Sequence, residues 1–429
     1  MRLLVESGAY DVRNLGDVAM LKVCVRRLRT LWPEARIDVV TADPARLAAA
    51  VPDATPLPRH PLGWWPDKPV FHVASLPRWL RGPTHATDRV VRRLAPVMAW
   101  RATRLRDRLA GACRRHAAGI ASFEGALEAA DAVVACGGGY LADDFAGHAV
   151  HVLGVLARAR ALGKPAAMFG QGLGPALHPV LRHRLRAGLR GLAVLALREG
   201  VRGPALIQEL GVRVPETMVT GDDALELACG GEPVSTPEAI GFNLRLASFA
   251  NIEPAHAGLV RDGVVQAART LGLPILPLPI SCFDTVNDSR AARELLGDTG
   301  LLEAGWEGQL TVEEVIRNAG RCGVVVTASY HSAVFALAQG APVIGLTRSA
   351  YYADKFNGLA ALFPSGVEVL ALDELGSAND LASATVRLWG KREALRPALV
   401  AAAIQQRDTG RRAYARFQEL VQSGRRPRV

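Results

Sequence analysis

This sequence of 429 residues has few lysines, no closely spaced pair of cysteines and no long apolar run. Its six cysteines lie far apart and form no C-x-x-C pair, which argues against a zinc site or a disulfide scaffold and predicts a reducing, cytoplasmic environment. No apolar run approaches the roughly 20 residues of a membrane-spanning helix. Glu6 stands where a signal peptide needs apolar residues, so we expect no export. These absences predict a soluble protein of two domains, at roughly 100–200 residues per domain.

Two nucleotide-binding signatures are also missing. The turn after the first predicted strand holds no G-x-G-x-x-G fingerprint, and the chain has no Walker phosphate loop. We therefore expect no NAD, no FAD, no other bound cofactor and no metal centre. No basic motif interleaved with aromatic residues is present, which argues against nucleic acid as a partner.

Positive charge is in excess, since 51 Lys and Arg residues face 41 Asp and Glu residues and give a net charge of +10. Arginines gather in two stretches, at about 76–118 and at 407–428. Such clusters attract phosphates, either of a substrate or of an anionic membrane surface. Runs of charge more often form solvated faces, so the charge alone leaves both interpretations open.

Short apolar runs alternate with longer amphipathic segments, a pattern typical of parallel βαβ units in an α/β fold. In the first part we expect a helix over 17–31, with Asp17 as its N-cap, and strands at 2–7, 36–41, 131–136, 164–170, 192–197 and 216–220. After a break, the pattern predicts helices over 258–271, 311–319 and 330–339 and strands at 239–244, 274–279, 322–328 and 342–346. Thr311 and Glu314 have the spacing of a capping box, which marks a helix start.

The break between the two parts, at 228–238, is rich in Gly, Pro, Ser and Thr and is typical of a linker. We therefore predict one Rossmann-like domain over 1–228, with the arginine-rich insert, and a second over 239–380. A final helical tract over 381–429 has no strand after it and could run back across the first domain. Two doubly wound halves of this kind leave a ligand cleft between them, at the carboxyl ends of their strands.

In the first part, candidate ligand-binding residues follow the predicted strands. Backbone N–H groups at a helix start and turns without side chains both suit a sugar or an anion, although each of these residues could equally serve a tight turn or a helix cap. Arg198 could instead form a surface pair with Glu199. The candidates are Asn14, Asp17, Gly137, Gly138, Gly139, Asp143, Gln171, Gly172, Arg198 and Asp222.

In the second part, His331 stands where a strand gives way to a helix. A histidine titrates near neutrality and can act as general acid or base, although a lone histidine at a helix start is often a cap or a core residue. Arg245 ends the first strand of this part, and Lys355 follows two tyrosines in a later loop, where it offers a point charge for phosphate.

These elements, in this order, resemble the polysaccharide pyruvyl transferase family from about residue 3 to 363. The matching motifs are NLGD at 14–17, GGG at 137–139, GQGLGP at 170–175, LRE at 197–199, TGD at 220–222, the turn around His331, and AQGAPVIG at 338–345. The resemblance implies two Rossmann-like domains in an arrangement like that of GT-B glycosyltransferases. It also implies transfer of a pyruvyl group from phosphoenolpyruvate, as a co-substrate, to a sugar of a cell-surface glycan.

The resemblance further implies roles for single residues. His331 would be the catalytic acid or base, and the donor would lie against Arg198, Arg245, Lys355, Ser329 and Tyr330. Many family members carry an arginine two residues before the histidine, and Ser329 stands there in this chain. Arg245 or Lys355 would then supply the contact to the donor. The glycine turns and Asp222 would face the acceptor, a sugar or lipid-linked glycan. The arginine clusters, separately, favour a lipid-linked acceptor and contact with an anionic membrane at its inner face.

Two other functions remain open from the sequence. A GT-B-type glycosyltransferase with a nucleotide-sugar donor would share the fold, the glycine turns and the phosphate-binding arginines. A binding protein without catalytic activity would keep the cleft, and Ser329 in place of an arginine fits that interpretation.

Overall fold

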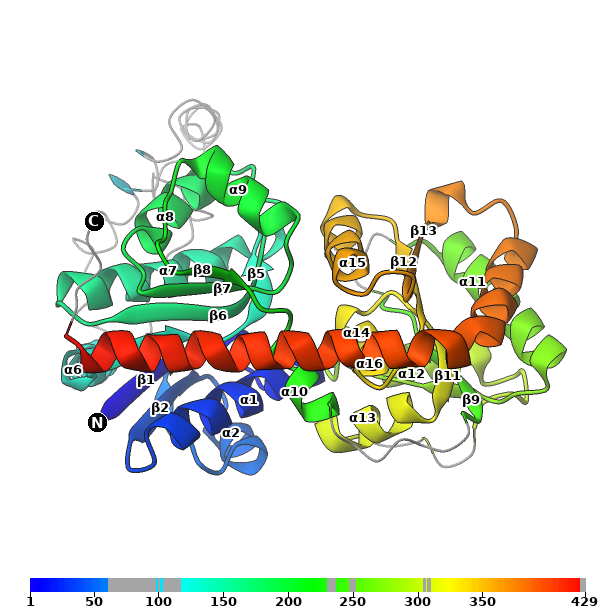
Figure 1. Ribbon diagram of the computed structural model, residues 1–429, viewed down its shortest axis with the longest axis horizontal. Coiled ribbons are helices and arrows are strands. Elements are labelled where there is room, and N and C mark those ends of the chain that lie inside the picture. The colour runs from blue at the N-terminus through cyan, green and yellow to red at the C-terminus, as the bar shows by residue number, and fades with distance from the viewer. Residues whose placement is uncertain are drawn as a thin grey trace, which may run out of the picture.

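A computed structural model describes residues 1–60, 98, 101–102, 117–229, 237–246, 252–303, 306 and 310–424. The arginine-rich stretch expected at about 76–118 lies almost entirely outside these residues, as do most of the expected linker and the last five residues. The described chain forms two parallel sheets, each covered by helices, which stand side by side in Figure 1. The α/β fold of two Rossmann-like halves is thereby confirmed.

The first sheet has the strand order β3-β2-β1-β4-β6-β7-β8, with β5 paired to β6. Its central strands are buried along most or all of their length, as parallel strands covered on both faces must be. The strands are β1 (Arg2–Glu6), β2 (Arg36–Thr41), β3 (Thr55–Pro58), β4 (Ala132–Ala135), β5 (Gly138–Leu141), β6 (Ala166–Leu173), β7 (Val194–Leu197) and β8 (Thr217–Val219). The helices are α1 (Leu15–Leu31), α2 (Pro44–Ala50), α6 (Ala117–Ala129), α7 (Ala146–Ala161), α8 (Pro179–Leu189), α9 (Arg202–Leu210) and α10 (Leu225–Ala228).

The second sheet has the order β10-β9-β11-β12-β13 and is also parallel throughout. Its strands are β9 (Ala239–Asn243), β10 (Ile275–Pro277), β11 (Cys322–Thr327), β12 (Val343–Thr347) and β13 (Val367–Ala371). Its helices are α11 (Pro254–Leu271), α12 (Asp288–Leu296), α13 (Val312–Gly320), α14 (Tyr330–Ala338) and α15 (Ala350–Leu362). The capping box at Thr311 and Glu314 is confirmed at the start of α13.

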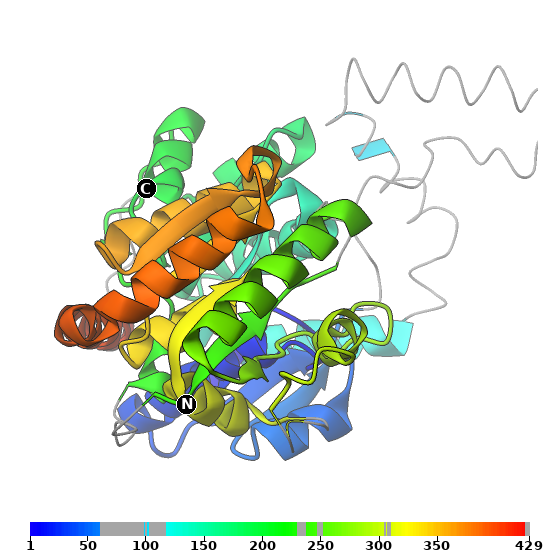
Figure 2. The ribbon, with the colours of Figure 1, turned by 90° about the vertical axis from the view of Figure 1, so that its right-hand side faces the viewer.

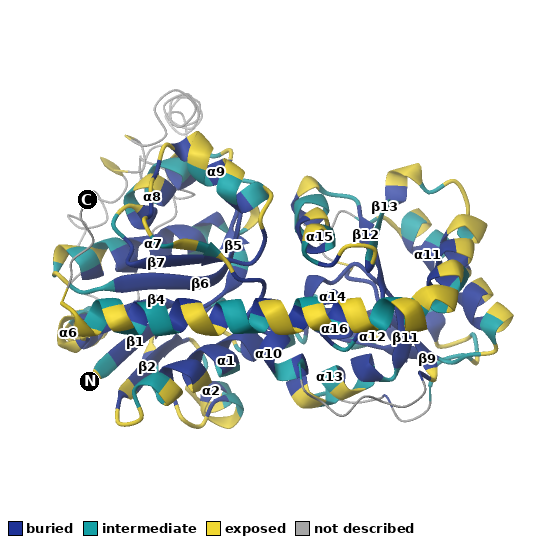
Figure 3. Ribbon diagram, viewed as in Figure 1, coloured by how far each residue is buried: buried dark blue, intermediate teal, exposed yellow. Residues whose placement is uncertain are grey.

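The last helix, α16 (Ala378–Gln422), extends along both halves in Figure 1, and its C-terminal part is seen nearly end-on in Figure 2. It packs against α11, α14 and β11 of the second half and against α1, β6 and β7 of the first. Buried and exposed turns alternate along it in Figure 3, because only one side of the helix meets the two sheets. No helix within the described ranges is both long and apolar enough to cross a membrane.

Two local expectations are corrected by the structure. Asn14, not Asp17, caps α1, because the Asn14 side chain accepts hydrogen bonds from the backbone N–H groups of Gly16 (3.0 Å) and Asp17 (3.2 Å). The glycine turn after β4 does not lead directly into a helix, since Gly138–Leu141 forms β5 and pairs with β6. Because Asn14 caps α1, the Asp17 carboxylate is left for another role.

Candidate active site

One cavity of about 350 Å³ opens where the strand ends of the two sheets face each other. Both halves contribute to its wall, which combines cations, the carboxyl group of Asp17, a histidine and several aromatic rings. The lining residues that concern the chemistry are Asn14, Asp17, Gly139, Arg198, Arg245, Ser281, Tyr330, His331, Tyr351, Tyr352 and Lys355. Eight of the residues that the sequence pointed to are therefore brought together here.

His331 lies in the first turn of α14, directly after β11, and only 7% of it is exposed. Its ring lies against Gly16, where an added Cβ would stand 2.0 Å from the ring atoms Cγ and Nδ1. Burial and the nearby cations Arg198, Lys355 and Arg245 lower the pKa of His331 well below its usual range. The imidazole is therefore neutral at physiological pH and can accept a proton.

Asp222 faces this imidazole from the first half. Its Oδ2 atom lies 3.7 Å from Nε2 of His331 and 3.9 Å from a guanidinium nitrogen of Arg198. Within the described part of the chain, Oδ2 of Asp222 and Nε2 of His331 are both buried without a hydrogen-bond partner. Burial raises the pKa of Asp222 to about 7. If Oδ2 of Asp222 and Nε2 of His331 moved slightly closer, they would form a carboxylate–imidazole hydrogen bond, the arrangement that orients a catalytic histidine.

Arg198 follows β7 and points across the cavity wall. Its backbone N–H donates to the carbonyl of Gln171 at 3.0 Å, and its guanidinium lies 4.2 Å from the centre of the Tyr330 ring. Gly172 makes room for this side chain, because a Cβ there would stand 2.5 Å from Nε of Arg198. The predicted residues Gly172 and Tyr330 thus help to place Arg198.

Arg245 is held by a carboxylate that the sequence did not single out. Asp288, the first residue of α12, lies 3.0 Å from the Arg245 guanidinium and also accepts bonds from the backbone N–H groups of Ile280 and Ser281. Ser329 is buried, and its hydroxyl oxygen lies 3.5 Å from Nη2 of Arg245. Arg245, two residues after the end of β9, therefore stands beside the position where Ser329 replaces an arginine.

Lys355 reaches the cavity from α15, so the stretch that we expected to be a loop is helical. Its ammonium hydrogen-bonds the Tyr351 hydroxyl and lies 3.7 Å from the centre of that ring. Tyr351 in turn donates to the carbonyl of Gly139 at 3.0 Å, which joins the two halves. Burial and the charges of Arg198 and Arg245 lower the pKa of Lys355 well below its usual range. An added anion would favour its charged form.

Asp17 completes the wall beside these cations. Burial raises its pKa to about 6, although Lys355, Arg245 and Arg198 all act in the opposite direction. A carboxyl group with a pKa near neutrality can both donate and accept a proton.

Seven of the predicted residues do not line the cavity. Gly172, Ser329 and Asp222 contact residues of its wall, whereas the other four support the surrounding turns. Gln171 is fully buried and donates from its amide to the carbonyl of Cys136 at 2.7 Å. Asp143 accepts bonds from the backbone N–H groups of the two residues that precede α8. Gly137 and Gly138 allow close packing, since a Cβ on Gly137 would stand 2.8 Å from the carbonyl oxygen of Gly170. Polar turn residues and glycines thus serve here as supports for the strand ends.

The aromatic residues Tyr351 and Tyr352 were seen in the sequence only as parts of a loop, but both line the cavity. Their position directly after β12, at the same sheet edge as His331, was the signal that could have identified them. Asp288 offered no such signal, because its partner Arg245 lies 43 residues away in the chain.

Two Rossmann-like halves around one cavity define a protein with the fold of the GT-B transferases and their relatives. Solved structures share this fold at low identity. UDP-GlcNAc 2-epimerase from Neisseria meningitidis, bound to UDP-GlcNAc, is 10% identical with a TM-score of 0.55, over 98% of this chain and 100% of that one. UGT89C1 from Arabidopsis thaliana, complexed with UDP, is 14% identical with a TM-score of 0.53, over 99% of each chain.

The family follows from the sequence itself. The family model of the polysaccharide pyruvyl transferases matches residues 14–350. The chain belongs to this family and is a transferase. No curated protein sequence matches the chain.

Proposed function

We propose that the protein transfers the pyruvyl group of phosphoenolpyruvate to two hydroxyls of one sugar, in a glycan or glycan precursor, and closes a cyclic ketal. The observation that carries this proposal is the convergence of Arg198, Arg245 and Lys355 with His331 in one cavity. Phosphoenolpyruvate carries a phosphate and a carboxylate, and guanidinium forks and ammonium groups are the natural partners of both. Arg245 lies beside Ser329 and supplies the positive charge that many family members carry on an arginine at that position.

The first chemical step adds one sugar hydroxyl to the donor. Asp17, in its protonated form, gives its proton to the methylene carbon C3, and positive charge develops at C2. The first hydroxyl attacks C2 and passes its proton to the neutral imidazole of His331. Asp222 stabilises the imidazolium that forms, and the three cations hold the negative groups of the donor.

The second step replaces phosphate by the other hydroxyl. His331 returns its proton to the bridging oxygen of the phosphate, and the bond between that oxygen and C2 breaks. The second hydroxyl attacks C2 and gives its proton to Asp17. The ketal and hydrogen phosphate are the products, and both Asp17 and His331 return to their starting protonation states.

A second candidate, a glycosyltransferase with a nucleotide-sugar donor, is supported by the fold shared with UGT89C1 in its UDP complex. Thermal unfolding with each donor separates the two. A ligand at 100 times its Kd that binds only the folded protein adds about 2.7 kcal/mol to the free energy of unfolding. We expect this shift with phosphoenolpyruvate and not with a panel of nucleotide sugars. The reverse result would favour the glycosyltransferase.

Turnover gives the direct test. Wild-type protein, phosphoenolpyruvate and a panel of acceptor sugars should release one inorganic phosphate for each ketal formed. His331→Gln should keep the donor-induced stabilisation and lose turnover by a factor of about 100 or more, the usual contribution of a general acid or base. Near-normal turnover in a folded His331→Gln protein would remove the histidine from the mechanism.

A further inference from the structure

A buried network of charged groups lies behind the active site, outside the cavity wall. Arg27 of α1 pairs with Asp223 at 2.6 Å and with Glu226 at 2.8 Å. Tyr414 of α16 donates from its hydroxyl to the other carboxylate oxygen of Asp223 at 2.8 Å. The side chains of Arg27, Asp223 and Glu226 are each at most 5% exposed.

The network is fixed in place by its surroundings. The Tyr414 ring stacks on Phe169 of β6 with 3.7 Å between the ring centres, and the Arg27 guanidinium lies 4.9 Å from the same tyrosine ring. Arg27 also packs against Gly410 of α16, where a Cβ would stand 2.9 Å from its guanidinium. The first and last helices of the described chain therefore meet at Asp223.

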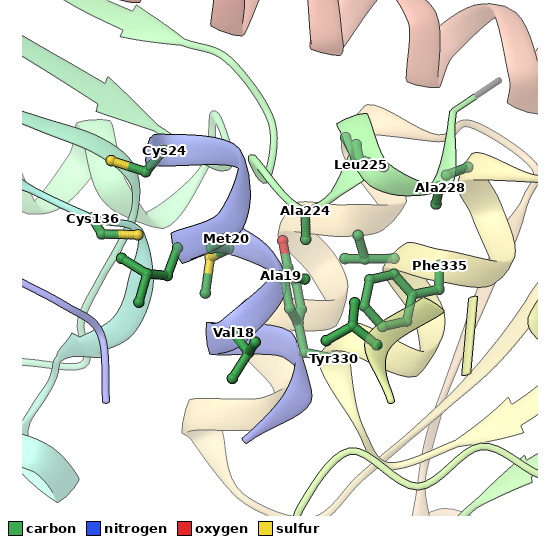
Figure 4. Packing of buried hydrophobic residues seen from close by; sticks show 14 of the residues in the cluster. Val18, Ala19, Met20, Cys24, Cys136, Ala224, Leu225, Ala228, Tyr330 and Phe335 are labelled. Carbon is green, nitrogen blue, oxygen red and sulfur yellow. The ribbon is translucent and has the colours of Figure 1, made fainter. Parts of the chain in front are cut away.

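Asp223 is joined directly to Asp222, the carboxylate that faces His331. The two neighbouring side chains point into different surroundings, Asp222 toward the cavity wall and Asp223 toward α1 and α16. The turn between β8 and α10 is short and closed, because Oδ1 of Asp222 accepts a bond from the N–H of Ala224 at 2.9 Å. Figure 4 shows how Ala224 and Leu225, on the same segment, pack beside α1 and the start of α14. A displacement of the backbone at Asp223 therefore also displaces Asp222.

We propose that Arg27 and Tyr414 are positioning residues, which act through Asp223 to hold Asp222 in line with Nε2 of His331. This inference rests on the proposed function, in which His331 moves protons and Asp222 stabilises its imidazolium. Neither residue touches the cavity. The last helix thus contributes to catalysis from behind the site, and its role extends beyond joining the two halves.

Stability alone explains the network poorly. Buried ion pairs often contribute no net stability, because the cost of removing both charges from water offsets their attraction, and apolar residues of similar volume commonly serve as well. An ion pair and a hydroxyl at fixed distances also define the orientation of the Asp223 carboxylate, which apolar packing would not do.

Tyr414→Phe tests the inference with little disturbance, since it keeps the stacked ring and removes only the hydroxyl that holds Asp223. We expect a fall in kcat of about tenfold, an unchanged KM for phosphoenolpyruvate, and an altered pH profile of kcat. Arg416→Gln is the matched control on the same helix, because it removes an ion pair of Arg416 with Glu216 far from the site. The control should leave kcat and its pH profile unchanged.

A second measurement makes the test independent of the donor. The imidazole nitrogen chemical shifts of His331, assigned through the His331→Gln variant, should move in Tyr414→Phe and not in Arg416→Gln. If these shifts move while the wild-type protein releases no phosphate from phosphoenolpyruvate, the positioning role stands and the proposed function fails. If Tyr414→Phe changes only the melting temperature and leaves kcat, the pH profile and the shifts as in wild type, the network is merely structural and the inference is overturned.

Discussion

The contact between Gly16 and His331 supports a sharp prediction about catalysis. A Cβ on Gly16 would stand 2.0 Å from the imidazole, whereas ordinary contacts begin near 3.4 Å, so Gly16→Ala must displace the ring by about 1.4 Å. Misplacement of a catalytic group by about 1 Å can cost roughly 100-fold in rate. We therefore expect kcat to fall by about 100-fold or more, which corresponds to about 2.7 kcal/mol of transition-state stabilisation.

The stability of the same variant should change far less than its activity. Overpacking at one position typically costs about 1–3 kcal/mol, so Gly16→Ala should still fold and should still be stabilised by phosphoenolpyruvate. Phosphate release and thermal unfolding measure the two effects. Gly258→Ala is the control, because nothing lies within 4 Å of a Cβ at that helical glycine, and it should leave kcat unchanged. A Gly16→Ala protein with wild-type kcat would show that His331 has no fixed role in the reaction.

Two further predictions concern carboxyl groups. Asp17→Asn should lower kcat by about 100-fold or more while the stabilisation by phosphoenolpyruvate persists, because an amide cannot give a proton to C3. Asp11→Asn, at an exposed position, is the control. Turnover of Asp17→Asn within threefold of wild type would exclude Asp17 as the acid. Burial raises the pKa of Glu6 from 4.5 to about 7, so the folded protein binds this proton more tightly than the unfolded chain and its stability falls as pH rises between those values. Glu6→Gln should therefore raise the free energy of unfolding by up to about 3 kcal/mol at pH 8 and by little at pH 4, as denaturant titrations at the two pH values would measure. Equal stability of the two proteins at pH 8 would contradict the assigned cause of the shift.

Much of the fold was predictable because its signals are local. Apolar runs of strand length separated by helical segments indicated both parallel sheets, and Thr311 with Glu314 marked the start of α13. The rule that parallel strands end at one edge of a sheet brought His331, Arg198, Arg245 and Asp17 into one cavity. Short strands such as β5 were missed, because three glycines indicate a turn more strongly than a strand.

The missing parts of the site depend on contacts that no local pattern reveals. Asn14 and Asp17 are both good helix caps, and only the geometry of the first turn shows which one accepts the bonds. Asp143 carries the same side chain as Asp17, yet its hydrogen bonds to the backbone before α8 use it as a support. The bond from Tyr414 to Asp223 joins residues 191 positions apart in the chain.

The candidate carboxylate–imidazole pair is divided between the two halves, with His331 in the second and Asp222 in the first, 3.7 Å away. Any motion that parts the sheets separates the imidazole from Asp222, Gly16 and Asp17 at the same time. In the proposed mechanism, proton transfer would therefore need the two halves together. The proposed acid, the proposed base and the supporting carboxylate would thus act as one unit only while the two halves enclose the reactants.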